Sequence, residues 1–400
     1  MTPIQQHPSP PAAQGFIPLS IPHIAGNEWK YLKECLDANF VSSVGPFVER
    51  FEQEMARFTG AKFAVACVNG TAALHVALRL GGVQPGDEVI VPTVTFIATV
   101  NAVRYVQAEP VFMDCDAFYN LDPVKTCQFL LEETVFKNGR TYNKQTGRRI
   151  AAFLPVHVFG NAAQLDALLP LCQERAIPVV EDAAESLGTV YTGGRFQGRH
   201  TGTVGTLGCL SFNGNKIITT GGGGMILTDH PALAAQAKYL TTQAKDDDAR
   251  FVHHEVGYNY RLTNVQAAMG VAQLEQLPRY LEIKRRNYAE YKRALDAVPG
   301  LHVAESPPYA ANNHWMYPLQ IDGAVFGEDR EAVMARLAQE RIQTRPLWYL
   351  NHRQRPYQNC QHYQIARAVE LWNKTLCLPC STNLSEPDAE RVVQALANPA

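Results

Sequence analysis

Short apolar runs alternate with amphipathic stretches between about residues 60 and 230. Strands are expected in the apolar runs, which are 62–68, 87–91, 109–116, 151–160, 177–184, 207–212 and 224–229. Helices are expected between them, at 71–80, 98–106 and 165–176. Strands that alternate with helices predict an α/β fold with a mostly parallel sheet covered by helices on both faces.

A second pattern follows in the C-terminal part of the chain. Residues 257–277 are expected to form a loop that leads into a long helix, with Thr263 as its N-cap. Beyond it, helices are expected at 286–295, 330–340 and 386–396, and a strand at 316–321. These patterns predict a large domain over 16–290 and a smaller α+β domain over 291–400. Residues 1–15 contain four prolines and are interpreted as a flexible tail and not as a signal peptide.

The segment 136–150 is polar and basic and contains Asn138-Gly139, a strong hairpin-turn signal. It is expected to form an inserted hairpin. Its sequence fits a solvated flap and a substrate-facing flap equally well.

Composition narrows the class of protein. The chain has 400 residues, of which 46% are hydrophobic, and its 36 basic and 38 acidic residues give a net charge of −2. This balance argues against a nucleic-acid surface or a membrane-seeking face. The nine cysteines, an odd and scattered number, indicate reduced thiols and a cytoplasmic protein. Cys377 and Cys380 form a single C-x-x-C pair, so no metal site is expected.

Ligands of such sheets bind at the carboxyl ends of the strands, where three polar stretches follow apolar runs. In the first, Gly70 allows another group to approach the backbone closely, and a helix is expected to begin near Thr71. This arrangement is either an anion-binding site or an ordinary turn between a strand and a helix. In the second, Asp182 follows a buried strand and needs a partner, either a cationic ring nitrogen or a protein cation. In the third, Lys216 precedes four glycines and is either a reactive amine or a surface lysine beside a turn.

A lysine, a carboxylate and an anion site are together what pyridoxal phosphate requires. The lysine would bind its aldehyde, the carboxylate would keep its ring nitrogen protonated, and the helix start would hold its phosphate. Phe96 would stack on the ring, or belong to the core. Ser211 would donate to the phosphate, or satisfy its own loop.

Seven motifs occur in order along the chain: NGTAAL, VPTVTFIATVNAV, PVFMDCD, PVHVFG, VEDAAESLG, SFNGNKIITTGGGGM and GYNYRLTNVQAAMGVAQLEQL. With them the chain resembles the DegT/DnrJ/EryC1/StrS family of sugar-nucleotide aminotransferases over roughly residues 16 to 400. The resemblance implies the fold of type I pyridoxal-phosphate enzymes, which is that of aspartate aminotransferase.

The resemblance also implies roles for single residues. Lys216 is then the Schiff-base lysine and Asp182 the partner of the pyridine nitrogen. Asn259 comes from the neighbouring subunit to the phosphate, which implies an obligate homodimer with shared active sites. The other implied cofactor-binding residues are Gly70, Thr71, Ala72, Phe96, Glu185, Ser211 and Asn213. Two positions depart from the family: Glu185 stands where Gln or His is frequent, and Gly222 where many members have Glu.

Related dehydratases carry histidine in place of the lysine, so Lys216 favours amino transfer. Segments 17–45, 142–149 and 241–247 resemble the branch that acts on UDP-4-keto-6-deoxy-N-acetylglucosamine and supplies 4-amino sugars for legionaminic acid and related bacterial surface glycans. The resemblance implies L-glutamate as donor and a ping-pong reaction through pyridoxamine phosphate. Lys216 then acts as general base and acid.

Candidate substrate residues come mainly from the C-terminal part of the chain. They are His314, Tyr317, Trp348 and His352, although residues of these types more often have a structural role. Arg148 of the hairpin is a further candidate, which would approach the diphosphate. Three alternatives remain open: an aminotransferase acting at C3 or C4 of a dTDP- or GDP-linked keto sugar, a lyase or desulfurase of the same fold, and a non-catalytic regulator that binds the cofactor. A pure regulator would need neither Lys216 nor Asp182.

Overall fold

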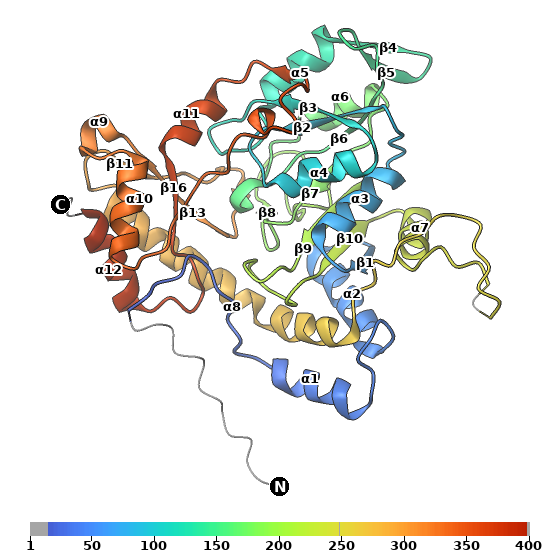
Figure 1. Cartoon of the computed structure of the whole chain (residues 1–400), viewed down its shortest axis with the longest axis horizontal. Coiled ribbons are helices and arrows are strands. Elements are labelled where there is room, and N and C mark those ends of the chain that lie inside the picture. The colour runs from blue at the N-terminus through green and yellow to red at the C-terminus, as the bar shows by residue number, and fades with distance from the viewer. Residues whose placement is uncertain (1–14, 248, 398–400) are drawn as a thin grey trace.

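A computed structural model describes residues 15–247 and 249–397 (Figure 1). The tail expected at residues 1–15 lies outside the described residues except for Gly15. The helices are α1 (Glu28–Asp37), α2 (Pro46–Thr59), α3 (Gly70–Leu80), α4 (Ile97–Tyr105), α5 (Pro123–Glu132), α6 (Leu168–Glu174), α7 (Pro231–Thr241), α8 (Asn264–Leu295), α9 (Gly323–Phe326), α10 (Arg330–Gln339), α11 (Arg367–Lys374) and α12 (Glu386–Ala397), with 3₁₀ turns η1 (Val158–Gly160) and η2 (Asn351–Arg353).

The strands are β1 (Phe63–Cys67), β2 (Glu88–Pro92), β3 (Glu109–Met113), β4 (Thr134–Lys137), β5 (Arg140–Asn143), β6 (Ile150–Phe153), β7 (Val180–Asp182), β8 (Val190–Tyr191), β9 (Leu207–Ser211), β10 (Gly224–Thr228), β11 (Leu301–Val303), β12 (Ala310–Ala311), β13 (Tyr317–Ile321), β14 (Arg345–Pro346), β15 (His362–Tyr363) and β16 (Thr375–Leu378). All the strands and helices expected between residues 62 and 229 are present, with shifted ends.

The large sheet is built from two four-stranded parts, in the orders β1-β10-β9-β7 and β15-β3-β2-β6. A parallel bridge between Phe153 and Val179 connects the two parts through the ends of β6 and β7. Neighbouring strands are parallel except where β10 pairs with β1 and β9. The expected mostly parallel sheet is therefore confirmed.

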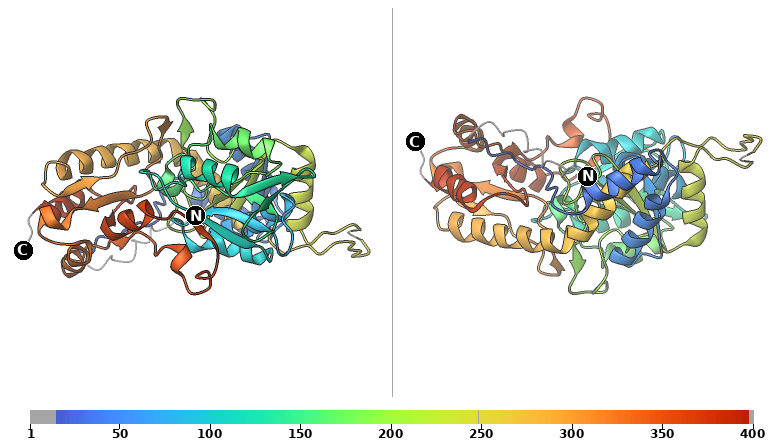
Figure 2. Two further views of the ribbon diagram at one scale, coloured as in Figure 1. Left: turned by 90° about the horizontal axis from the view of Figure 1, so that it is seen from above. Right: turned by 90° about the horizontal axis from the view of Figure 1, so that it is seen from below.

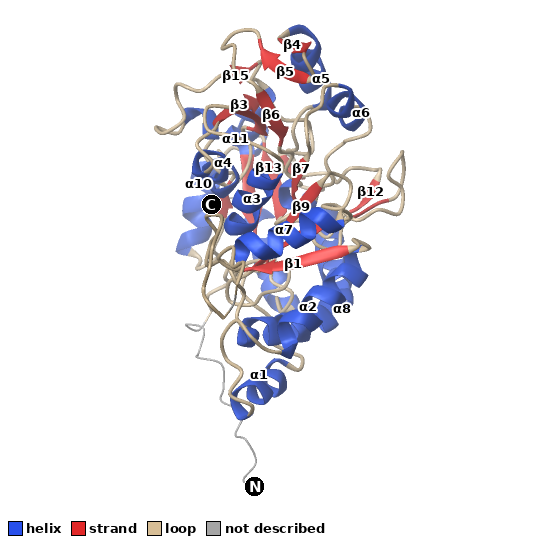
Figure 3. Cartoon of the chain, turned by 90° about the vertical axis from the view of Figure 1, so that its right-hand side faces the viewer, coloured by secondary structure: helices blue, strands red, loops and turns tan. Residues whose placement is uncertain are grey.

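Helices cover both faces of this sheet (Figure 3). Val89 and Val91 pack with residues of α3, α4 and α7 on one face. Ile90, one residue along, packs on the opposite face with residues of α5 and α6, and residues of α2 and α8 continue that layer. This alternation follows from the two-residue period of a strand, and it explains why buried strands here are apolar throughout.

The strand expected at 151–160 is shorter, because β6 ends at Phe153. Phe159 has φ 59° and Gly160 has φ 88°, so the chain turns through η1 there. The hairpin expected at 136–150 is confirmed: β4 pairs with β5, and Asn138 and Gly139 at its turn both have positive φ. Such angles are those of a two-residue hairpin turn, for which Asn-Gly is favoured.

Helix α8 runs through the place where two helices were expected, and it carries the chain from the large sheet to a second sheet (Figures 1 and 2). Thr263 caps it through a capping box with Gln266, as expected. Pro278 lies inside the helix and costs one backbone hydrogen bond. The helix continues past it because Leu281, Tyr291 and Leu295 extend its buried face.

The second sheet is antiparallel, in the order β11-β13-β16-β14, and packs with α10, α11, α12 and the end of α8. Between β14 and β16 the chain crosses back to the large sheet, where β15 pairs in parallel with β3 at its edge. This return places residues 345–353 beside the ends of the large-sheet strands. Across the described ranges, each helix is too short or too polar to span a lipid bilayer.

Candidate active site

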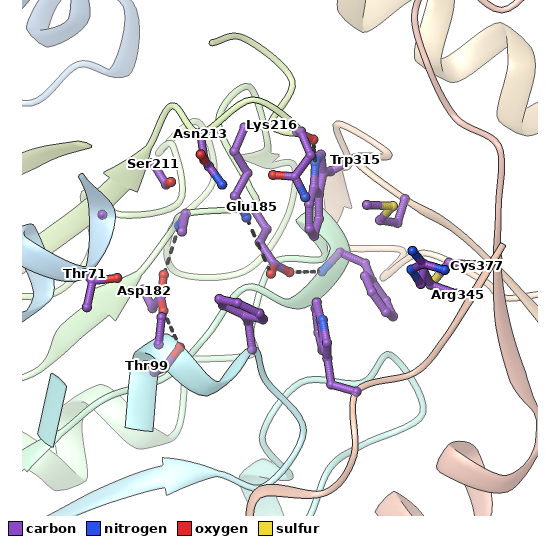
Figure 4. Close-up of a pocket in the computed structure, with 18 of the residues that line it drawn as sticks. Thr71, Thr99, Asp182, Glu185, Ser211, Asn213, Lys216, Trp315, Arg345 and Cys377 are labelled. Carbon is purple, nitrogen blue, oxygen red and sulfur yellow. Dashed lines mark hydrogen bonds and ion pairs between the residues drawn. The ribbon is translucent and has the colours of Figure 1, made fainter. Parts of the chain in front are cut away.

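A cavity of about 680 Å³ lies between the large sheet and the returning segment 345–349. Thr71 and Asp182 lie toward one end and Arg345 toward the other, with Lys216 between them (Figure 4). The expected site residues that line it are Gly70, Thr71, Phe96, Asp182, Glu185, Ser211, Asn213, Lys216 and Trp348. The structure thus brings together strand ends and loops that lie far apart in sequence, from Gly70 to Trp348.

The start of α3 forms one end of the cavity. Asn69 caps the helix, and its Oδ1 accepts a 2.7 Å hydrogen bond from the amide of Ala72. Ala72 is buried and does not line the cavity, and its amide is already used by this cap. A Cβ at Gly70 would lie 2.8 Å from the Cβ of Ser211, so only glycine lets the serine approach the helix start.

The glycines after Lys216 serve the same end of the cavity. A Cβ at Gly224 would lie 2.4 Å from the backbone of Asn69, so the run allows the lysine loop to pack against the cap of α3. Gly221 and Gly223 have φ 80° and 153°. At Gly222 a Cβ would meet nothing closer than 3.8 Å, and nothing in the structure explains the loss of the glutamate common in the family.

Asp182 ends β7 and is 3% exposed. Its Oδ2 accepts a 2.7 Å hydrogen bond from the hydroxyl of Thr99, and its Oδ1 accepts one of 3.0 Å from the amide of Ala184. Burial raises the pKa of this carboxyl, and Thr99, Ala184 and the charge of Lys216 oppose the increase. A buried carboxylate held mainly by neutral donors has capacity for a cation.

The amine of Lys216 lies between a carboxylate and an aromatic face. Its Nζ is 3.8 Å from Oε1 of Glu185 and 3.9 Å from the ring centroid of Trp315. Burial lowers the pKa of Lys216, and Glu185 and Asp182 counteract the decrease. Burial raises the pKa of Glu185 to about 7, while Lys216 and the amide of Phe159, which donates to Oε2 at 2.8 Å, oppose it.

Aromatic rings close the cavity around these groups. Phe96 is 51% exposed and lines it, so it is not a core residue. Trp348 stacks on Phe159 with ring centroids 5.0 Å apart and lies 6.4 Å from Phe96. Arg345 follows at the far end: among the described residues that line the cavity, it and Lys216 are the cations.

Several expected site residues lie elsewhere in this chain. Tyr317 is fully buried and donates to the carbonyl of Lys284, because strand alternation turns it into the core of the second sheet. His314 stacks on Tyr288 at 4.0 Å. His352 is 2.6 Å from the hydroxyl of Thr93. Arg148 and Asn259 also lie outside the cavity lining. Nη1 of Arg148 is 3.9 Å from Oε1 of Glu109, and Asn259 forms a backbone bridge with Thr242.

Three residues of the site were missed from the sequence. Thr99 follows Phe96 by three positions in the same motif, and this spacing places both residues on one side of the start of a helix. Thr99 could therefore have been predicted as a site residue from the position of Phe96. Trp315 and Arg345 come from distant segments, and no local pattern marks them.

The residues present fit pyridoxal phosphate. Gly70 leaves a cradle at a helix start for a phosphate, Asp182 offers a buried carboxylate for a ring nitrogen, and Lys216 offers a buried amine between them. Groups of three or more His, Cys, Asp or Glu arranged to hold a metal do not occur among the described residues.

Comparison with known proteins agrees with this geometry. The model of the DegT/DnrJ/EryC1/StrS aminotransferase family matches residues 22–397. EpsN of Bacillus subtilis, which carries the name of a pyridoxal phosphate-dependent aminotransferase, is 38% identical over 385 residues, 94% of each chain. GDP-perosamine synthase of Caulobacter vibrioides is 37% identical over 383 residues, 95% of this chain and 97% of that one.

One solved structure is similar to this chain in both fold and sequence. The crystal structure of DesI in the presence of its TDP-sugar product superposes with a TM-score of 0.84 at 30% identity, covering 97% of this chain and 94% of that chain. The fold of type I pyridoxal-phosphate enzymes is thereby confirmed. The chain belongs to the DegT/DnrJ/EryC1/StrS aminotransferase family and is a pyridoxal phosphate-dependent aminotransferase.

Proposed function

We propose that the chain transfers the amino group of L-glutamate to the C4 keto group of UDP-4-keto-6-deoxy-N-acetylglucosamine. The product, a 4-amino-4,6-dideoxy sugar nucleotide, would serve the synthesis of a bacterial surface glycan. The observation that carries the reaction is the placement of Lys216, Asp182 and the start of α3 around one cavity. The resemblance of segments 17–45, 142–149 and 241–247 to one branch of the family supports the choice of sugar.

When bound, pyridoxal phosphate supplies an aldehyde that carries the amino group and a ring that withdraws electrons from the reacting carbon. Lys216 would bind the aldehyde, and its free amine would take up and return a proton at the reacting carbons. Asp182 would hold a proton on the ring nitrogen, and Thr99 orients the carboxylate of Asp182 through its hydrogen bond. Thr71 and Ser211, with Gly70 and Asn213 beside them, would hold the phosphate, and Phe96 would cover the ring.

The resemblance to the family implies that Glu185 stands where Gln or His is frequent. The raised pKa of Glu185, about 7, leaves a large share of this carboxyl protonated at neutral pH. A protonated Glu185 would donate to the cofactor's ring oxygen and would not repel it.

The substrate end of the cavity is assigned to the returning segment. Arg345 has no carboxylate partner among the described residues and faces the cavity, so it would receive an anionic group of a substrate, either a carboxylate of the donor or the diphosphate of the sugar nucleotide. Trp348 would contact the sugar. Asn259 lies outside the cavity of its own chain. The resemblance to the family supports a role for it at the phosphate of the neighbouring subunit's cofactor in a homodimer.

A GDP-linked substrate is the second candidate. It is favoured by the 37% identity to a protein named GDP-perosamine synthase. A dTDP-linked substrate is the third, since DesI was solved with its TDP-sugar product.

A substrate panel distinguishes them. The holoenzyme is incubated with L-glutamate and UDP-, GDP- or dTDP-linked 4-keto-6-deoxy sugars, and products are identified by mass spectrometry and NMR. The proposal expects the highest kcat/KM with the UDP-linked N-acetylated sugar. A preference for the GDP-linked sugar would replace it, and failure to aminate any keto sugar would reject the sugar-nucleotide class.

A further inference from the structure

Lys216 must exist as a free amine during each turnover, and in the structure that amine touches one aromatic face. Its Nζ lies 3.9 Å from the ring centroid of Trp315, well within the distance at which a cation is attracted to an indole. The Lys216 side chain is 13% exposed and Trp315 is 3% exposed, so little water screens the contact. Trp is the side chain that attracts a cation most strongly in this geometry.

The indole is tied to the lysine's own loop. Its Nε1 donates a 2.7 Å hydrogen bond to the carbonyl of Asn215, the residue immediately before Lys216. This hydrogen bond joins the indole directly to the loop that carries the amine. The single polar atom of the indole is satisfied in the same contact, as a buried indole requires.

A buried asparagine fixes the ring relative to the carboxylate on the other side of the amine. Oδ1 of Asn313 accepts a 2.9 Å hydrogen bond from the amide of Trp315, and its Nδ2 donates at 2.8 Å to the carbonyl of Glu185. Asn313 is fully buried. The two groups that flank the amine are thus held by one side chain.

A second lysine holds the backbone of Trp315. Nζ of Lys284 donates to the carbonyl of Trp315 at 2.8 Å and to the carbonyl of Cys380. Lys284 is 2% exposed, and no carboxylate pairs with it among the described residues. Its ammonium is held by neutral carbonyls, which orient the backbone at Trp315.

We propose that Trp315 is a positioning residue for the catalytic amine: its indole face receives the ammonium of Lys216 whenever the lysine is released, and Asn313 and Lys284 hold the ring in place. The proposal rests on the proposed role of Lys216 and adds a resting position for it. Glu185 and Asp182 are the acidic groups that act on the amine, and Lys284 is a cation that contacts the backbone of Trp315.

The test measures the amine directly, without turnover. Cofactor-free protein is labelled with a trace of acetic anhydride across the neutral-to-alkaline pH range, and the Lys216 peptide is quantified by mass spectrometry. Wild type is compared with Trp315→Phe, whose ring attracts a cation less, and with Trp315→Leu, which has no ring. Trp372→Leu is the matched control, since Trp372 lies over the guanidinium of Arg330 at 5.1 Å but does not line the cavity.

The labelling midpoint of Lys216 is expected to fall in the order wild type, Trp315→Phe, Trp315→Leu, with about one pH unit between the first and last. Trp372→Leu is expected to keep the wild-type midpoint. Equal midpoints, or a higher midpoint in Trp315→Leu, would overturn the proposal. Should Trp315→Leu not fold, as judged by circular dichroism, an unchanged midpoint in Trp315→Phe is enough to overturn it.

The same labelling separates this proposal from the proposed function. Pyridoxal phosphate is expected to protect Lys216 from acetylation in the wild type. Absence of protection would reject Lys216 as the cofactor-binding lysine, whatever the order of midpoints. Protection without the ordered midpoints would reject only the role of Trp315.

Discussion

The hydroxyl of Thr99 donates a 2.7 Å hydrogen bond to Oδ2 of Asp182. The hydroxyl of Thr95 lies 2.9 Å from that of Thr99, and Nδ2 of Asn351 donates at 2.7 Å to the carbonyl of Thr95. The carboxylate at the end of β7 is thus supported by a chain of polar contacts that begins in the returning C-terminal segment. These contacts link the returning segment to Asp182, the residue proposed to face the cofactor's ring nitrogen.

Thr99→Val removes the donor to Asp182 and keeps the shape of the side chain. Loss of a hydrogen bond to a charged group costs about 1.5–3 kcal/mol, so kcat/KM is expected to fall about tenfold or more. Steady-state kinetics with L-glutamate measure the effect. Thr99→Ser restores the hydroxyl and is expected to recover most of the activity, and a Thr99→Val enzyme with wild-type kcat/KM would show that the contact is dispensable.

Lys216→Arg keeps a positive charge between Glu185 and Trp315 but cannot bind the aldehyde of the cofactor. We expect turnover to be lost, because an arginine neither bonds the aldehyde nor releases a proton near neutral pH. Lys374→Arg is the matched control: Lys374 is half-buried, lies outside the cavity lining and pairs with Glu370 on the same helix, so this variant should retain full activity. Steady amination of the keto sugar by the Lys216→Arg enzyme would refute the assignment.

Arg345→Leu removes the cation at the far end of the cavity. We expect KM to rise about tenfold for the substrate whose anionic group the guanidinium binds, since a charge-assisted hydrogen bond is lost. A rise for L-glutamate alone identifies a carboxylate, and a rise for the sugar nucleotide alone identifies the diphosphate. Arg355→Leu, at an exposed position outside the cavity lining, is the control, and unchanged KM values for both substrates would contradict the assignment.

Glu185→Gln tests the raised pKa of this carboxyl. The folded-state pKa of about 7 lies above the ordinary glutamate pKa of 4.5, so the folded protein binds more protons than the unfolded chain between these values. The contribution of Glu185 to stability therefore falls as pH rises through this window, by at most about 3 kcal/mol. Glu185→Gln removes that loss.

Urea unfolding of the cofactor-free proteins at about pH 5 and about pH 8 measures this effect. Wild type is expected to lose more stability than Glu185→Gln between the two values. An equal loss in both proteins would mean that Glu185 is ionised throughout the window.

Local signals predicted the large sheet and the loops at its strand ends. Apolar runs bounded by polar turns marked β1, β2, β3, β7, β9 and β10. Gly70, Asp182 and Lys216 lie at or soon after the ends of three of these strands. Asn138-Gly139 and the cap Thr263 were identified because turns and caps depend on a few adjacent residues. Such features need no knowledge of tertiary contacts.

The substrate end of the cavity depends on tertiary contacts and could not be read from local pattern. Trp315 reaches Lys216 across about a hundred residues, and Arg345 reaches the cavity only because the chain crosses back. Tyr317 was expected at the substrate end of the cavity. It begins β13 instead, and its side chain packs in the core of the second sheet. The continuous α8 was missed because Pro278 ordinarily ends a helix, and burial of the later turns overrides that preference.

The visible absorption spectrum of the purified holoenzyme, recorded before and after L-glutamate and again after a keto sugar nucleotide, tests the central claim most directly. We expect a visible band that bleaches when L-glutamate donates its amino group and returns when UDP-4-keto-6-deoxy-N-acetylglucosamine accepts it. The Lys216→Arg protein should show neither change. A wild-type band that L-glutamate leaves unaltered, or a protein that takes up no pyridoxal phosphate, would contradict the account.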